Sequence, residues 1–256
     1  MTMNYDILEK ELLLESLRKA LKKNSKELPP INFSYEQYVD VIYNEIQNGT
    51  FKFDSVIKFT LPFGDKILKI DRCSLKNRVV EYSLAKKIYY INKDYWYEYR
   101  NNIFRTGSGL NEYVRNAQRF RGKYEYYYII DLKHAFGINY IKLREDFLIK
   151  NLTKEQVELI DKALFSENDI KNGLPFGHKL SNILFDCNLI EIEKELTTLG
   201  YKFLRLIDSF MFFTNFKTDI EKINKIFERN KIRINEKKSK VVKNDEFIEY
   251  EKEILI

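Results

Sequence analysis

Two aspartates stand where short hydrophobic runs end or turn, and both suit metal chemistry. Asp131 ends the run YEYYYIID, and Asp208 lies between the runs LRLI and FMFF. Two carboxylates in one site repel each other, and a divalent cation removes that cost because Mg²⁺ prefers oxygen ligands. A pair of such ions can activate an attacking 3′-hydroxyl and stabilise a leaving pyrophosphate. On spacing alone, solvated surface acids remain the commoner alternative.

The segments around the two acids predict a sheet that would bring them together. Residues 126–131 are strongly β-prone, and KFLRLIDSFMFFTNF predicts two strands with Ile207 and Asp208 at the bend. From Tyr126 onward the expected order is β-α-α-α-β-β-α-β, which reduces to a split βαβ, or ferredoxin-like, layout. In that layout the first strand lies beside the central hairpin, and the two acids can meet although they are far apart in the sequence.

The helices of this half follow from periodicity. Between the first two strands we expect three helices: one at about 140–150, one after Thr153, and one over SNILFDCNLIEIEKEL. A further helix is expected at about 217–230, with short strands at about 239–243 and 246–255.

The first half of the chain reads as helices around one hairpin. An amphipathic helix is expected over 4–24, and a second begins at Ser34, where Ser34 and Gln37 have capping-box spacing. The runs FDSVIKFTL and DKILKID flank a Pro/Gly turn and predict a β-hairpin. Helical pattern follows at about 74–99 and 110–120, with a turn at 105–109. The expected segments are an N-terminal helical segment 1–50, a region 51–125, and a region 126–256 with a helical insertion at about 140–170.

Composition permits a polyanion partner without requiring one. The chain has 256 residues with 44% hydrophobic residues, enough for one sizeable core, and its net charge of +6 is modest. Cys73 and Cys187 have no metal-type spacing, which favours a reducing compartment. No run approaches the length of a membrane span, and no signal peptide is evident, so a cytoplasmic protein without membrane contact is expected.

Four segments in order resemble the motifs of one family. YYIIDLKHAF resembles the first palm motif of reverse transcriptases, GLPFGHKLSNILFDCNL the second, FLRLIDSFMFF the hairpin that usually carries Tyr-x-Asp-Asp, and INEKKSKVV the next motif. FIEYEKEI resembles the start of the primer-grip hairpin. The resemblance is nearest to bacterial abortive-infection and phage-defence reverse transcriptases. It implies an α+β fold, with helix-rich fingers at 51–125, a ferredoxin-like palm at 126–256 and no evident thumb.

The resemblance also implies roles for particular residues. Asp131 and Asp208 match metal ligands for Mg²⁺ or Mn²⁺. Lys238 matches a catalytic lysine that could neutralise or protonate departing pyrophosphate, with a solvated lysine in a lysine-rich stretch as its alternative. Phe136 matches an aromatic gate against a ribose 2′-hydroxyl, with core packing as its alternative. The other expected nucleotide-binding residues are Gly173, Pro175, Phe176 and Gly177 in the second motif and Lys66, Lys69, Arg72 and Arg78 in the fingers. The alternative for each of these four cations is an ordinary surface charge without a ligand.

The sequence also departs from the family pattern. Leu206 and Ser209 replace the Tyr and the second Asp of the hairpin motif, so the site loses one negative charge, and Phe176 stands where Gln or a small residue is common. The chain ends at Ile256, soon after the primer-grip region. A homo-oligomer or a partner protein is therefore expected to supply the functions of a thumb.

Two interpretations of function remain open at this point. The first is a DNA polymerase of reverse-transcriptase type that uses dNTPs and an RNA or DNA template and primer. The second is a catalytically degenerate palm that binds RNA or serves as a structural subunit of a larger complex. For the second, a group of aromatic residues offers a partner surface, with helix core as the alternative: Tyr89, Tyr90, Tyr95, Trp96, Tyr97 and Tyr99.

Overall fold

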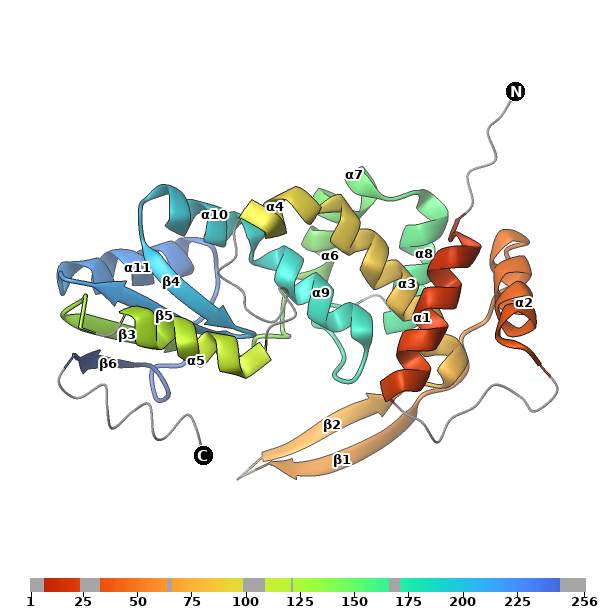
Figure 1. Ribbon diagram of the computed structural model, residues 1–256, viewed down its shortest axis with the longest axis horizontal. Coiled ribbons are helices and arrows are strands. Elements are labelled where there is room, and N and C mark those ends of the chain that lie inside the picture. Colours follow the sequence, from red (N-terminus) through yellow and green to blue (C-terminus); the bar gives the residue numbers. More distant parts are fainter. Residues whose placement is uncertain are drawn as a thin grey trace. The chain divides into compact units, whose positions relative to one another are not determined.

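The computed structural model describes residues 7–23, 33–63, 66–98, 109–120, 122–165 and 171–244. They form two compact units (Figure 1). The first unit contains residues 1–92 and 136–188, and the second contains residues 93–135 and 189–256. Each unit is therefore built from two separate stretches of sequence. The boundaries expected for fingers and palm stay predictions.

The first unit is mainly helical. Its helices are α1 (Lys10–Lys23), α2 (Tyr35–Gln47), α3 (Leu75–Ile91), α6 (Tyr140–Leu143), the π-helical η1 (Arg144–Leu148), α7 (Ile149–Asn151), α8 (Lys154–Leu164) and α9 (Lys179–Asn188). The capping box predicted at Ser34 is confirmed, because its side chain accepts from Gln37 N–H and the Gln37 side chain accepts from Ser34 N–H. That exchange satisfies two backbone donors that the first turn of α2 would otherwise leave unpaired.

One β-hairpin completes the first unit. Strand β1 (Ile57–Phe63) pairs antiparallel with β2 (Lys66–Arg72), as the sequence predicted. Apolar side chains on this two-stranded ribbon remain exposed, among them Ile57, Phe59, Leu61 and Ile67. An isolated ribbon buries little area, so its attachment to the helices must come from its ends.

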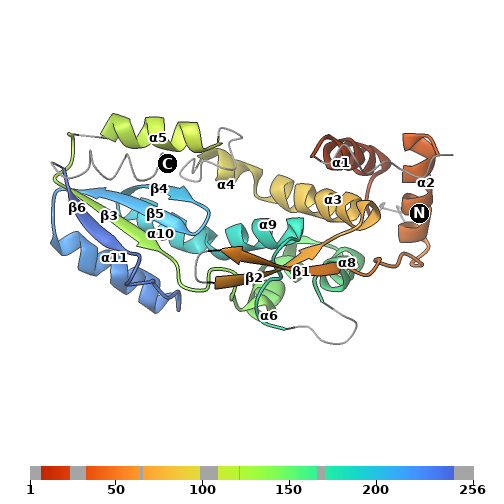
Figure 2. The same cartoon turned by 90° about the horizontal axis from the view of Figure 1, so that it is seen from below.

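The second unit is the predicted ferredoxin-like sheet. Its strands are β3 (Tyr126–Asp131), β4 (Lys202–Leu206), β5 (Ser209–Thr214) and β6 (Lys240–Lys243), hydrogen-bonded in the order β4-β5-β3-β6. All neighbouring pairs are antiparallel. Its helices are α4 (Lys93–Glu98), α5 (Gly109–Phe120), α10 (Ile190–Thr198) and α11 (Thr218–Arg229). Helix α5 covers one face of the sheet, and α10 and α11 cover the other (Figure 2).

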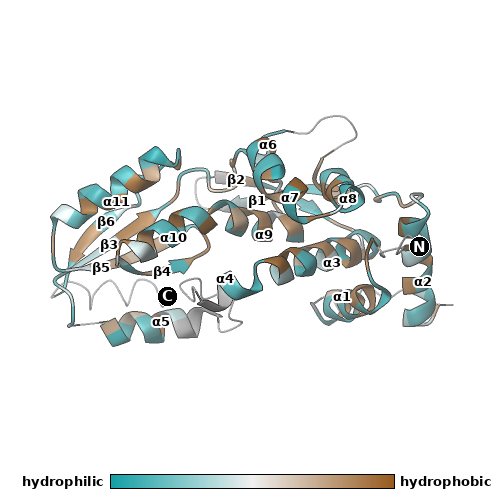
Figure 3. Ribbon diagram, turned by 90° about the horizontal axis from the view of Figure 1, so that it is seen from above, coloured by the Kyte–Doolittle hydropathy of each residue, from teal (hydrophilic) through white to brown (hydrophobic). Residues whose placement is uncertain are grey.

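Alternation along the strands divides the core of this unit into two layers. Tyr127, Ile129, Met211 and Phe213 point to the α5 side, where they form a buried cluster with residues of that helix. Phe210 and Phe212 point to the other side, and both rings contact Phe227 of α11. The hydrophilic and hydrophobic faces of α11 are visible in Figure 3. Strand β3 is thus buried on both faces and holds Asp131 at the end of a rigid element.

Some sequence expectations need correction or lie outside the described residues. The single helix expected over SNILFDCNLIEIEKEL is wrong, because it breaks at Leu189 into α9 and α10. No glycine or proline marks that break. The strand expected at 246–255 and residues 105–108 of the expected turn fall outside the described ranges. Within those ranges, no helix is long and apolar enough to cross a membrane.

Candidate active site

The second unit brings Asp131 and Asp208 together through strand pairing. Asp131 is the register partner of Ser209, the residue that follows Asp208. Leu132 N–H also donates to the Asp208 carbonyl oxygen at 3.0 Å. The two acids therefore sit on adjacent strand ends, with Ser209 directly opposite Asp131 and on the same face of the sheet.

Asp208 is held in a tight two-residue turn between β4 and β5. Its neighbour Ile207 has φ 57°, and this positive value at the first turn position is the pattern of a type II′ hairpin. A β-branched residue in that conformation is strained. Arg205 supports the turn, because its Nη1 donates to the Ile207 carbonyl oxygen at 2.6 Å.

Arg205 is itself anchored by a buried ion pair. Its side chain and that of Glu193 on α10 are both fully buried, and the Nε of Arg205 donates to Glu193 Oε1. The other oxygen of Glu193 accepts from the Tyr95 hydroxyl at 2.7 Å. A buried charge is tolerated only when it is paired and hydrogen-bonded. The turn that carries Asp208 is therefore fixed from inside the unit.

The segment from Ile234 to Ser239 wraps around Asp131. Asn235 donates through Nδ2 to Asp131 Oδ1 at 3.0 Å and through its backbone N–H to the Asp131 carbonyl oxygen at 2.8 Å. Lys238 Nζ lies 3.6 Å from Asp131 Oδ2, and Asp131 N–H donates to Ser239 Oγ at 3.1 Å. Lys238, predicted as a catalytic residue, thus lies at the acid pair. The contacts of Asn235 and Ser239 had no separate prediction, although both belong to INEKKSKVV.

Electrostatics favour a cation at this site. Burial raises the pKa of the Asp208 carboxyl, its own backbone N–H opposes that rise, and the neighbouring Asp131 charge raises it further. Lys238 and Arg205 also lower it. Two carboxylates that repel each other provide the oxygen donors that hard divalent ions require. The donor set fits Mg²⁺ or Mn²⁺: Asp131 and Asp208 would be the residues to hold such an ion, and neutral Ser209 would be a weaker oxygen donor.

The predicted nucleotide-binding residues lie in the first unit. The half-buried ring of Phe136 lies 4.8 Å from that of Phe176 and 5.2 Å from that of Phe185, so Phe136 packs in an aromatic group. Gly173 N–H donates to the Ile138 carbonyl, and Pro175 accepts from the Ser181 hydroxyl through its carbonyl oxygen. Phe176 is 44% exposed at the surface of this loop.

Gly177 has a packing reason to be glycine. Its φ is 103°, and a Cβ built on it would lie 2.0 Å from the Asp71 carbonyl oxygen. Asp71 N–H also donates to the Phe176 carbonyl at 2.9 Å. The backbone of β2 therefore lies directly on the loop 173–178, and any side chain at position 177 would separate them.

The fingers cations are distributed rather than gathered. Lys69 and Arg72 are exposed on β2, and their odd spacing of three sends their side chains to opposite faces of the ribbon. Arg78 is half-buried on α3. The side chain of Lys66 lies outside the described residues. Lys69 and Arg72 therefore do not share one face of the ribbon.

Sequence reasoning missed the pair of Arg205 and Glu193. The available signal was a charged residue inside the apolar strand FLRLI, because a charge at a core position needs a buried partner. Its partner could not be read from the sequence, since Glu193 lies on α10 among other acids.

The aromatic residues that were expected to offer a partner surface differ in their surroundings. Tyr90 is 52% exposed, Tyr89 is half-buried, and Tyr95 hydrogen-bonds Glu193. The side chains of Trp96, Tyr97 and Tyr99 lie outside the described residues.

Comparison with known proteins defines the family. The family described as "Reverse transcriptase (RNA-dependent DNA polymerase)" matches residues 68–250. This chain belongs to that family. No curated protein matches the sequence.

Solved structures share the fold. Apo telomerase from Candida tropicalis matches with a TM-score of 0.53 and 16% identity, over 91% of this chain and 48% of that one. A structure of the same apo telomerase without its C-terminal domain matches with a TM-score of 0.50 and 15% identity, over 82% of this chain and 56% of that one. This chain spans about half the length of the solved structures that it matches.

Proposed function

We propose that this chain is a DNA polymerase of reverse-transcriptase type that transfers deoxynucleotides by a two-metal mechanism. The observation that carries the proposal is the register of β3 and β5, which sets Asp131 opposite Ser209 and beside Asp208. Membership of the reverse transcriptase family supports it. The substrates would be dNTPs and an RNA or DNA template with its primer.

The residues of the second unit have distinct tasks in this proposal. Mg²⁺ or Mn²⁺ held by Asp131 and Asp208 would supply activation of the primer hydroxyl and charge stabilisation on the phosphates. Asn235 orients the Asp131 carboxylate through Oδ1. Lys238, 3.6 Å from Asp131 Oδ2, would carry a proton or a positive charge to the departing pyrophosphate. Arg205 fixes the backbone of the turn at Asp208.

For the first unit we propose nucleotide contacts by the residues named from the sequence. Lys66, Lys69, Arg72 or Arg78 would bind the triphosphate, and Gly173, Pro175, Phe176 and Gly177 would line the nucleotide. Phe136 would discriminate against a ribose 2′-hydroxyl. Phe136→Ala should lower the ratio of dNTP to NTP incorporation. An unchanged ratio would contradict this role of Phe136.

Incorporation of labelled dNTPs with Mg²⁺ or Mn²⁺, with and without primer-template, tests the activity. Asp131→Asn should reduce incorporation by about 100-fold or more, as expected when groups that stabilise developing charge are removed. Asp146→Asn is the matched control, because that side chain is 57% exposed and its ion pairs are long, at 4.0 Å. Incorporation that survives Asp131→Asn at the wild-type rate would refute the proposal.

The second candidate is a degenerate palm that binds RNA or supports a larger complex. Ser209 favours it, since a neutral residue beside Asp208 weakens divalent binding. In this case the protein binds RNA with no dNTP incorporation under any metal condition, and Asp131→Asn leaves RNA binding intact. A filter-binding measurement run beside the incorporation measurement separates the two candidates.

The biological setting is proposed from the sequence resemblance. We infer a role in bacterial anti-phage defence, in the cytoplasm, with a second copy or a partner protein adding contacts to the nucleic acid. Plating efficiency of phage on cells that express wild type or Asp131→Asn tests the role. Equal plating on both strains would contradict a catalytic defence role. Light scattering with and without RNA tests whether the chain forms an assembly.

A further inference from the structure

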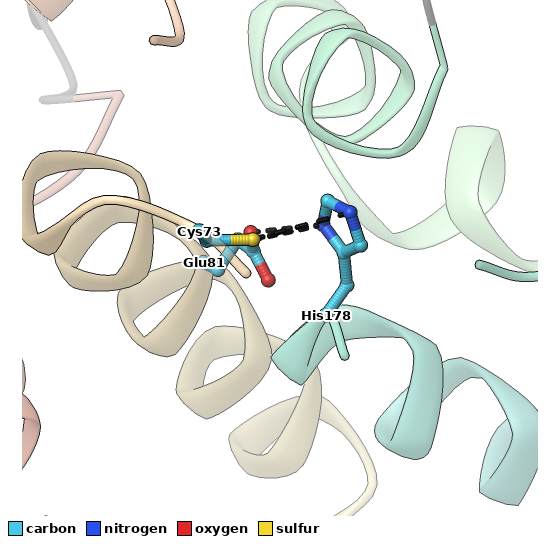
Figure 4. A group of neighbouring side chains, drawn as sticks. All are labelled: Cys73, Glu81 and His178. Carbon is cyan, nitrogen blue, oxygen red and sulfur yellow. Dashed lines mark hydrogen bonds and ion pairs between the residues drawn. The ribbon is translucent and has the colours of Figure 1, made fainter. Parts of the chain in front are cut away.

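Three buried side chains of different chemistry meet in the first unit. Cys73 lies between β2 and α3, Glu81 lies on α3, and His178 directly precedes α9. Their exposed fractions are 4%, 1% and 4%. One donor atom from each residue lies within 4.8 Å of the other two. Figure 4 shows the thiol, the carboxylate and the imidazole pointing toward one another.

The distances are close to those of a tetrahedral metal site. Cys73 Sγ lies 3.5 Å from His178 Nδ1, and that nitrogen lies 3.0 Å from Glu81 Oε1. Zinc bonds of about 2.3 Å to sulfur and about 2.0–2.1 Å to nitrogen put those two atoms about 3.6 Å apart in a tetrahedron. Sγ is also 3.9 Å from Nε2, so binding through Nδ1 needs a rotation of the imidazole.

Further contacts orient two of these donors from outside the cluster. Asp71 Oδ2 lies 3.5 Å from His178 Nε2, the ring nitrogen that faces away from Glu81. Glu81 Oε2 accepts from the backbone N–H of Lys179, the first residue of α9, at 2.7 Å. A histidine that binds metal commonly gives its second N–H to a carboxylate, and that contact sets the tautomer and the ring orientation.

We propose that Cys73, Glu81 and His178 form a binding site for a zinc-type divalent ion. Mixed sulfur, nitrogen and oxygen donors select zinc and its neighbours over Mg²⁺ and Ca²⁺, which prefer oxygen alone. The chain provides three ligands, and water provides the fourth. The site goes beyond the proposed polymerase function and shares no residue with the pair of Asp131 and Asp208.

The ion would add a further link among three elements that already touch, α3 and α9 through Glu81 and Lys179, and β2 and the loop before α9 through Asp71 and Phe176. Cys73 fixes the end of β2, Glu81 fixes α3, and His178 fixes the start of α9 next to Gly177. The hairpin already contacts this loop through the hydrogen bond from Asp71 N–H to Phe176 O. A metal ion there would hold the exposed ribbon β1–β2 at its base, where a two-stranded sheet needs support.

Cobalt titration of the full chain tests the site. With excess Mg²⁺ present to occupy hard oxygen sites, we expect about one Co²⁺ per chain and a thiolate-to-cobalt charge-transfer absorption, with Zn²⁺ displacing the Co²⁺. Cys73→Ser should abolish that absorption, and His178→Gln should weaken binding at least tenfold. Cys187→Ser is the matched control, because Cys187 is also buried in the first unit but lies outside the cluster. Asp131→Asn should bind Co²⁺ as wild type does.

A measurement on the wild type covers the case in which the variants do not fold. Zn²⁺ added to chelator-treated protein should raise the melting temperature, because an ion that binds only the folded state stabilises it. No cobalt absorption in a folded wild-type chain, or the same absorption in folded Cys73→Ser, would overturn the proposal. In either case the cluster would be a hydrogen-bonded His178–Glu81 pair only.

Discussion

Ser209 is the residue at which the proposed metal affinity of the candidate active site is best tested. It lies directly opposite Asp131 across the strand pair, on the same face. Ser209→Asp should raise the affinity for Mn²⁺ by about tenfold or more, because an additional charged oxygen ligand joins the site. Without divalent ions the same variant should be less stable by on the order of 1 kcal/mol, since like charges face each other.

Isothermal titration with Mn²⁺ and urea denaturation in chelator check both effects. Ser209→Asn is the control, because it adds an oxygen donor without adding charge. Equal Mn²⁺ affinity in Ser209→Asp and wild type would show that position 209 does not face the ions.

Asp208 should make the stability of the metal-free protein depend on pH. Burial and the Asp131 charge raise the pKa of this carboxyl above its ordinary value. The folded state therefore binds more protons than the unfolded state in the window between the two pKa values, and stability falls as pH rises through that window.

Asp208→Asn removes that loss, so it should melt at a higher temperature than wild type at pH 7 in chelator. The difference should shrink as pH falls toward about 4, the ordinary pKa of aspartate. Mg²⁺ should stabilise wild type more than Asp208→Asn. A difference in melting temperature that grows as the pH falls would contradict this account.

At the scale of elements, the turn between β4 and β5 depends on the buried ion pair beneath it. Arg205→Met should cost about 3–5 kcal/mol, because it leaves Glu193 charged and buried without its partner. The double change Arg205→Met with Glu193→Leu should recover most of that stability. It should not recover metal affinity at Asp208, because the Ile207 carbonyl loses its donor in both variants.

The two variants therefore separate positioning from stability. Urea denaturation measures the stability of each variant, and Mn²⁺ titration measures the positioning of Asp208. If the double variant regained both stability and Mn²⁺ affinity, the role of Arg205 would be structural only.

The loop 173–178 makes a matched pair of glycine substitutions possible. Gly177→Ala should cost about 3 kcal/mol or more, since its Cβ would lie 2.0 Å from the backbone oxygen of Asp71 and its φ is 103°. Gly173→Ala should cost only about 1 kcal/mol, because its φ of 92° is strained but its nearest neighbour is 3.6 Å away. Thermal melts of both variants measure the two losses of stability. Equal losses would contradict the close approach of the β2 backbone to Gly177.

Most elements could be predicted because their signals are local. The capping box at Ser34 and the alternation in YYYIID each lie within one element. The break at Leu189 had no such signal, since α9 and α10 both have helical patterns and nothing between them disfavours a helix. It coincides with the point where the chain passes from the first unit to the second, which is a property of the tertiary fold.

For the molecule as a whole, the sequence predicts a site whose residues belong to recognisable motifs. It does not predict a site whose residues come together only in the tertiary fold. Asp131 and Asp208 could be paired in advance because the ferredoxin-like strand order dictates which strands touch. The cluster of Cys73, Glu81 and His178 could not, because its residues come from three segments without a metal-type spacing. The two cysteines gave no sign of it, since only one of them takes part.

The net charge of +6 leads to a prediction for the whole molecule. If about four phosphates are contacted, RNA affinity should fall about 50-fold between 50 and 200 mM salt, because binding releases counterions from the single strand. Fluorescence anisotropy with a labelled RNA at several salt concentrations measures the slope. Asp131→Asn should keep that slope while losing dNTP incorporation, since the carboxylate acts on the reacting groups and the cations act on the backbone. RNA binding that does not respond to salt would contradict a phosphate-based interface, and with it the nucleic-acid contacts that the proposed polymerase requires.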